Sequence, residues 1–197
     1  MDISESAKNY IEKMFAGAAV PPLAETDPEF AALFANFAFD EVVKQDDLDD
    51  KTRFIAILAA LVGCQGVDAF KGMLHAALNF GVTAEEAREI VYQAVAYLGI
   101  GRVLPFFAAA NEVFAASGIS LPLDGCAAVT AENRLERGEQ TQVDIFGEGM
   151  RGFSKSGPQE SRHINRWLSA NCFGDYYTRK GLDYRQREMI TFCFLAA

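Results

Sequence analysis

The sequence is poor in the residues that build metal sites and disulfide frameworks. Its cysteines and histidines are Cys64, Cys126, Cys172, Cys193, His75 and His163. They are widely separated, and no Cys-x-x-Cys pair occurs. Because zinc sites need closely spaced ligands and only two histidines could join the cysteines, we expect no metal centre. In a reduced compartment the thiols are expected to stay free, buried and inert.

Basic residues are also scarce. The chain has 18 Lys and Arg against 27 Asp and Glu, which gives a formal net charge of −9. Such a surface repels a phosphate backbone instead of releasing its counterions. We therefore expect no nucleic-acid partner.

Long hydrophobic runs are missing as well. The longest charge-free apolar run, residues 54–67, is shorter than the ~18 to 20 residues that a membrane helix needs. The first ten residues lack the basic-then-apolar order of a signal peptide. These absences favour a protein without membrane association, and we expect a cytoplasmic location.

Apolar residues are plentiful, at 50% of the 197 residues, and they recur at helical spacing. No convincing alternating run of strand type occurs, so the pattern predicts an all-α fold. Helices are expected from Pro28 to about Phe37, after Asp50 up to Gly63, over about residues 67–80 with Gly81 as the end signal, from a capping box at Thr83–Glu86 to about Leu98, over about residues 103–116 and 130–139, around Ile164–Leu168, and at the end of the chain. The Gly-x-Gly at 99–101 follows a helix and lacks a third glycine, which indicates a turn instead of a dinucleotide site.

The chain repeats part of itself. At one fixed offset, Leu48-Asp49 pairs with Leu182-Asp183, Arg53 with Arg187, and Leu61 with Leu195. A connector at residues 119–127 divides a first module, residues 1–125, from a connector helix and an incomplete second module, residues 126–197. Because the final apolar helix has no closing element, we expect the native protein to continue past Ala197.

Three segments resemble the carboxymuconolactone decarboxylase and alkylhydroperoxidase D-like superfamily in its tandem-module form. They are LDDKTRFIAILAALVG, AALNFGVTAEEAREIVYQAVAYLGIGRVLPFFAAANEV and INRWLSANCFGDYYTRKGLDYRQREMITFCFLAA. The resemblance covers about residues 28–118 and 140–197. It implies a helical bundle of the alkylhydroperoxidase D-like type, a small-molecule substrate and assembly into homo-oligomers.

The peroxidase branch of this superfamily uses a Glu, a Cys-x-x-Cys pair and a following His. The resemblance assigns these positions to Phe54, Gly66, Ala69 and Met73 in the first module. A thiolate must attack the peroxide and a second thiol must resolve the sulfenic acid. The first module therefore lacks the machinery of the peroxidase branch.

Two residues are candidates for catalysis. Glu188 follows Arg187 and matches the relay acid of the family, which the first module has lost. His75 lies two residues from the family's His position, roughly 200° around an ideal helix. It is therefore a candidate for proton transfer in a rearranged pocket, with a structural histidine as the alternative.

Three residues are candidates for substrate binding. Arg53, or Arg102 in its place, could anchor a carboxylate, and Gln93 stands where relatives often carry a polar residue or His. Cys64 lies outside the Cys-x-x-Cys register but near it. An ordinary structural or surface role remains the alternative for each.

The resemblance implies a cofactor-independent decarboxylase that acts on a small carboxylated lactone or a related acid. A general acid would protonate carbon as carbon dioxide leaves, and a cationic or polar group would hold the carboxylate. Two alternatives stay open. One is antioxidant activity of the alkyl hydroperoxide reductase type, which the absent Cys-x-x-Cys disfavours, and the other is a non-catalytic oligomeric scaffold or binding protein.

Overall fold

The structure, a computed structural model, describes residues 2–16, 23–45 and 47–197, and every regular element within these ranges is helical. The α-helices are α1 (Glu5–Met14), α2 (Leu23–Thr26), α3 (Pro28–Asn36), α4 (Asp50–Gly63), α5 (Val67–Asn79), α6 (Ala84–Leu98), α7 (Ile100–Ala116), α8 (Arg134–Phe146), α9 (Arg162–Trp167) and α10 (Tyr184–Ala196). The π-helices are η1 (Phe37–Glu41) and η5 (Leu168–Tyr177). Short 3-10 turns are η2 (Val42–Lys44), η3 (Glu148–Met150) and η4 (Phe153–Lys155). The all-α prediction is confirmed.

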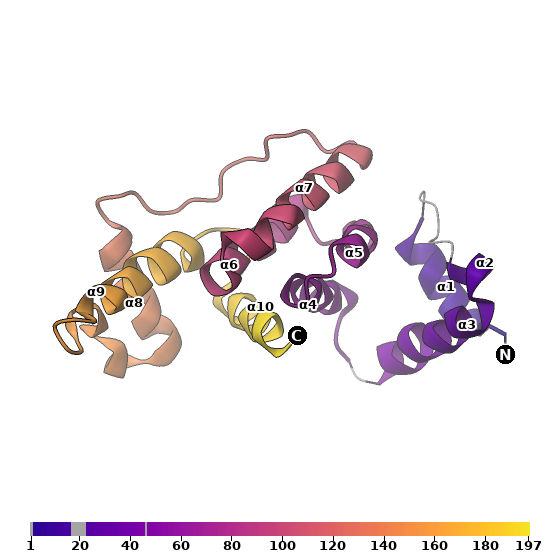
Figure 1. Ribbon diagram of the computed structural model, residues 1–197, viewed down its shortest axis with the longest axis horizontal. Coiled ribbons are helices and arrows are strands. Elements are labelled where there is room, and N and C mark those ends of the chain that lie inside the picture. Colours follow the sequence, from indigo (N-terminus) through magenta and orange to yellow (C-terminus); the bar gives the residue numbers. More distant parts are fainter. Residues whose placement is uncertain (1, 17–22, 46) are drawn as a thin grey trace.

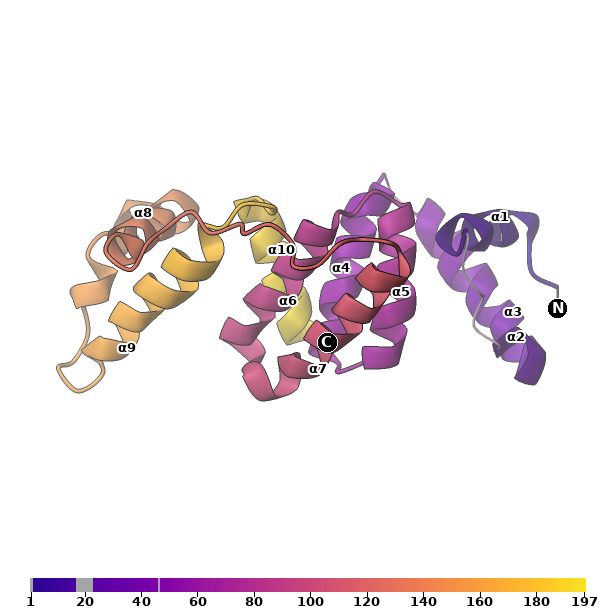
Figure 2. The same ribbon diagram turned by 90° about the horizontal axis from the view of Figure 1, so that it is seen from above.

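The helices form three groups arranged in a row (Figures 1 and 2). Helices α1 to α3 lie at one end, α8 and α9 lie at the other, and α4 to α7 form the central bundle. The last helix, α10, returns to this bundle and packs against α4 and α6. A long connector joins α7 to α8. The predicted division at residue 125 stays a prediction.

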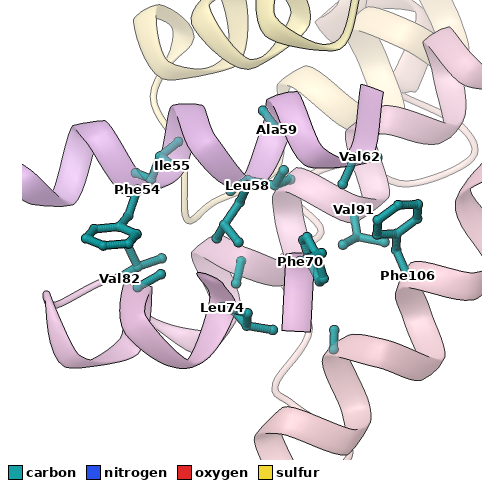
Figure 3. Close-up of a cluster of buried hydrophobic side chains, with 14 of the residues drawn as sticks. Phe54, Ile55, Leu58, Ala59, Val62, Phe70, Leu74, Val82, Val91 and Phe106 are labelled. Atoms are coloured by element: carbon teal, nitrogen blue, oxygen red, sulfur yellow. The ribbon is translucent and has the colours of Figure 1, made fainter. Parts of the chain in front are cut away.

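The core of the central bundle is apolar and fully enclosed (Figure 3). Phe54 and Leu58 of α4 point into it beside Leu74 of α5, and the ring of Phe70 meets that of Phe106 edge to face at 5.1 Å. Burying each such side chain stabilises the fold by about 1.5–3 kcal/mol. This core holds α4, α5, α6 and α7 as one scaffold.

Several predicted helix ends are confirmed by local hydrogen bonds. The hydroxyl of Thr83 accepts from the backbone N–H of Glu86, whose carboxylate accepts from the N–H of Thr83 in return. Gly81 follows α5 with φ of +85°, a conformation that favours glycine. The sequence therefore marks both sides of the α5–α6 turn.

Two helices begin away from their predicted positions. Helix α7 starts at Ile100 instead of residue 103, because Gly99, with φ of +78°, makes the turn alone. Helix α8 starts at Arg134 instead of residue 130, since the side chain of Asn133 accepts from the N–H of Thr130 and closes a turn there. It then continues past residue 139 to Phe146.

The segments that the sequence pairs share local structure. Asp49 caps α4 by accepting from the N–H of Thr52, and Asp183 caps α10 in the same way with Gln186. Each segment is preceded by a π-helix, η1 or η5. Arg53 and Arg187 both donate to carbonyls of the loop before their own helix.

Helix α10 is joined to α6 through a buried guanidinium. Arg187 is 0% exposed and donates to Oε1 of Gln93 at 2.8 Å and to Oε2 of Glu89 at 3.1 Å. Glu89, itself 1% exposed, also accepts from Nε of Arg179 at 2.9 and 3.0 Å. The carboxylate thus bridges two arginines and fixes α10 against the central bundle.

Helix α8 and the π-helix η5 cross at two glycines. A Cβ on Gly138 would overlap the carbonyl oxygen of Ser169 and lie 2.7 Å from the backbone nitrogen of Gly174. A Cβ on Gly174 would in turn overlap the carbonyl of Arg134. The two backbones can approach this closely only without side chains.

We therefore expect Gly138→Ala to lower the free energy of unfolding by about 1–3 kcal/mol, because backbone must move. The matched control is Gly72→Ala in α5, where a Cβ meets nothing within 4 Å. That change should raise stability by roughly 0.5–1 kcal/mol through helix propensity. Urea unfolding of both variants checks the pair, and equal effects at the two glycines would contradict the crossing.

Arg187→Ala should lower the free energy of unfolding by about 3–5 kcal/mol, because it leaves the buried carboxylate of Glu89 with one cation fewer. Arg151→Ala is the control, since Arg151 pairs with Glu148 on the surface. It should cost less than about 1 kcal/mol. Denaturant unfolding measures both losses of stability. Similar losses for the two variants would show that the ion pair of Arg187 with Glu89 does not hold α10.

Candidate functional site

The candidate site lies where α10, α6 and η5 meet. Arg187 of α10 points into the α6 interface, and Glu188 follows it on the half-buried edge of that interface. The hydroxyl of Tyr177, which is buried, donates to Oε1 of Glu188 at 2.7 Å. The π-helix η5 thus places the phenol hydroxyl of Tyr177 next to the carboxylate of Glu188 on α10.

Further polar groups surround the Tyr177 hydroxyl. The hydroxyl of Tyr97, from α6, lies 3.0 Å from it, and Oγ1 of Thr191 lies 3.2 Å from it. The thiol of Cys172 donates to the Tyr97 hydroxyl at 3.5 Å. We refer to Cys172, Tyr97, Tyr177 and Glu188 as the tyrosine chain.

The direction of the hydrogen bonds in the tyrosine chain follows from proton counting. A phenol has one proton to donate. Because the proton of Tyr177 goes to Glu188, Tyr97 must donate to Tyr177. The thiol of Cys172 then donates to Tyr97, so every proton points toward the carboxylate. Such a one-way chain polarises each bond in turn and ends on the Glu188 carboxylate.

Electrostatics keep these donors protonated. Burial raises the pKa of Tyr177, and the charge of Glu188 adds to this, although the hydrogen bonds with Thr191 and Tyr97 act the other way. Burial also raises the pKa of Tyr97. Burial raises the pKa of the Cys172 thiol too, although its hydrogen bond with Tyr97 acts the other way. At neutral pH all three side chains are therefore neutral donors.

Gln93 joins the same network from α6. Its Nε2 donates to Oγ1 of Thr191 and to the carbonyl of Arg187, both at 2.8 Å. Because Thr191 contacts Tyr177, which contacts Glu188, the structure connects Gln93 and Glu188, two of the predicted site residues. Gln93 is fully buried, so its contacts are with α10 and not with solvent.

His75 lies on a different helix pair. It is half-buried on α5, which packs against α4, α7 and α1, whereas α10 packs against α4 and α6. Among the described residues, its Nε2 is buried without a hydrogen-bond partner, and no hydrogen bond joins it to Glu188.

Arg53 and Cys64 lie at opposite ends of α4. Nη2 of Arg53 donates to the carbonyls of Leu48 at 3.0 Å and Val43 at 3.4 Å. Cys64 follows α4, is exposed, and its thiol donates to the carbonyl of Leu61 at 3.7 Å. Neither residue has a hydrogen bond to the tyrosine chain among the described contacts.

Three residues of the site were not predicted from the sequence: Tyr97, Tyr177 and Thr191. One signal was present for Tyr97, which stands four residues after Gln93 and so shares its helix face. Tyr177 lies eleven residues before Glu188 across a loop, and no periodicity links the two. Their pairing depends on how η5 packs on α10.

Within residues 2–16, 23–45 and 47–197, no group of three or more His, Cys, Asp or Glu side chains is placed to hold a metal ion. In that same part of the chain, no helix combines the length and hydropathy needed to span a bilayer.

Similarity to known proteins covers the first part of the chain. Residues 28–112 match the carboxymuconolactone decarboxylase family, a match that runs from α3 through most of α7. A 4-carboxymuconolactone decarboxylase from Acinetobacter baylyi is 29% identical over 98 residues, which cover 50% of this chain and 73% of that protein. Glu188 lies outside the family match. Together these similarities support a relationship between this part of the chain and the carboxymuconolactone decarboxylase superfamily.

Proposed function

We propose that the protein is a cofactor-independent decarboxylase of a small carboxylated lactone or a related acid, with Glu188 as the group that transfers the proton. The observation that carries the proposal is the tyrosine chain, whose hydrogen bonds all run toward the Glu188 carboxylate. The name of the Acinetobacter relative supports the substrate class.

The reaction needs a proton at a defined place. When the bond to the substrate carboxylate breaks, carbon dioxide leaves and the electron pair stays on the remaining carbon. Glu188, after its carboxylate has taken up a proton from water, would deliver that proton to this carbon and become a carboxylate again. The Tyr177 hydroxyl would stabilise this carboxylate by its 2.7 Å hydrogen bond, and a proton from water would then restore the acid.

The other site residues take supporting roles in the proposal. Gln93 acts as a positioning residue through Thr191 and the carbonyl of Arg187. His75 is a second proton-transfer candidate, whereas Arg53 and Cys64 are candidates for binding substrate. We place Glu188 in a second module, residues 126–197, that packs on a first module, residues 1–125.

A non-catalytic oligomeric scaffold is the second candidate function. It is favoured by large apolar side chains on the surface, among them Phe37 on η1, Trp167 on α9 at 63% exposure and Phe192 on α10 at 72%. Around Phe37, the exposed side chains of Phe30, Leu33 and Phe34 recur at helical spacing on α3, and a contiguous apolar surface of this kind is typical of protein interfaces. We therefore infer homo-oligomers under both candidate functions.

Glu188→Gln should lower the rate of lactone decarboxylation by about 10²–10⁴-fold, the usual contribution of a general acid. Tyr177→Phe should lower kcat less, because the Glu188 carboxylate that forms in the reaction then lacks the donor that stabilises it. Carbon dioxide release from 4-carboxymuconolactone measures both effects.

The control for this experiment is Glu112→Gln, which removes the same charge from a surface ion pair with Lys71. It should leave turnover unchanged. Equal activity of the wild-type protein and Glu188→Gln would overturn the role of Glu188, and no turnover by a correctly folded wild-type protein would favour the scaffold.

Hydroperoxide reduction should be absent. Burial raises the pKa of the thiols of Cys126, Cys172 and Cys193, which disfavours the thiolate that attacks peroxide. We expect no consumption of cumene hydroperoxide with dithiothreitol above the protein-free rate. Dithiol-dependent turnover that Cys64→Ser abolishes would instead assign a peroxidase activity.

A further inference from the structure

A cavity of about 370 Å³ lies on the side of α6 that faces the connector. It is bounded by α6, by Leu121 to Cys126 of the connector and by Arg179 from the loop before α10. Its volume is in the range of small-molecule sites. None of its lining residues belongs to the tyrosine chain, so it is independent of the proposed function.

The α6 side of the cavity is a polar stripe. Glu85, Arg88, Glu89 and Tyr92 line it, at the spacing that puts residues on one face of a helix. Glu89 forms ion pairs with Arg179 and Arg187. The other charged groups of the stripe, Glu85 and Arg88, have no ion pair among the described residues, and neither has Asp124 on the connector.

The guanidinium of Arg88 contacts α7 and the ring of Tyr92. Its Nη2 donates to Oδ1 of Asn111 at 2.5 Å, and its guanidinium carbon lies 5.3 Å from the ring centre of Phe114 and 6.0 Å from that of Tyr92. The guanidinium of Arg179 lies 4.9 Å from the Tyr92 ring centre. Two fixed cations therefore flank one aromatic ring.

Unpaired charges of both signs in one cavity specify a ligand that carries both signs. A simple carboxylate would meet Arg88 but would also face Glu85 and Asp124, and a simple amine would face the opposite problem. A zwitterion satisfies both sets. Leu121 and Leu123 supply an apolar wall for a side chain.

We propose that this cavity binds a small zwitterion of the amino-acid type with an apolar side chain. Arg88 holds the carboxylate, Glu85 and Asp124 hold the ammonium group, and the connector covers the side chain. The occupant is thus defined by its charges at both ends.

Titration calorimetry of the whole chain with three probes tests this proposal: L-phenylalanine, 3-phenylpropanoate, which lacks the ammonium group, and 2-phenylethylamine, which lacks the carboxylate. L-phenylalanine should bind, and each analogue should bind at least about tenfold more weakly, which corresponds to about 1.4 kcal/mol. No heat from L-phenylalanine, or equal affinity for an analogue, would overturn the proposal.

Matched variants locate the binding. Glu85→Gln and Asp124→Asn should each weaken L-phenylalanine binding and leave 3-phenylpropanoate unaffected or bound more tightly, whereas Arg88→Met should weaken both. Glu112→Gln removes one negative charge elsewhere on the surface and should change nothing. If Glu112→Gln weakens binding as much as Glu85→Gln does, the effect is one of net charge and the cavity is not the site.

Discussion

The arrangement of α6 and α10 depends on the buried guanidinium of Arg187. Removing such a charge from water costs several kcal/mol, and close hydrogen-bonded partners must offset that cost. Glu89, Gln93 and the carbonyls of Arg179 and Lys180 supply these partners. The Arg187 guanidinium can reach all of these partners only when α10 has one particular rotation about its axis. The ion pair therefore selects that rotation.

That rotation also decides what Glu188 contacts. Adjacent helix residues point about 100° apart, so fixing Arg187 toward α6 turns Glu188 toward η5 and the hydroxyl of Tyr177. Gln93 reinforces the arrangement, because it bonds both to Arg187 and to Thr191, one turn further along α10. The ion pair that stabilises the fold therefore orients the tyrosine chain as well.

Sequence patterns predicted the parts of the structure that local chemistry controls. The cap at Thr83 and the glycine at 81 act within a few residues, so they could be recognised. The start of α7 was missed because a single positive φ at Gly99 suffices for the turn. Glu188 was predicted from the family resemblance. Its contact with Tyr177 depends on how η5 packs against α10, and no spacing in the sequence predicts that packing.

The repeat offers an argument that Tyr177 and Glu188 act as one unit. The offset that relates Arg53 to Arg187 also relates Phe54 to Glu188 and Val43 to Tyr177. Phe54 is buried, with its ring centre 4.8 Å from that of Phe80, and Val43 is apolar as well. At these two positions the first segment is therefore apolar where the second is polar. A buried phenol without its acceptor would lose a hydrogen bond. Both members of the pair are thus polar in one segment and apolar in the other, as expected if each requires the other.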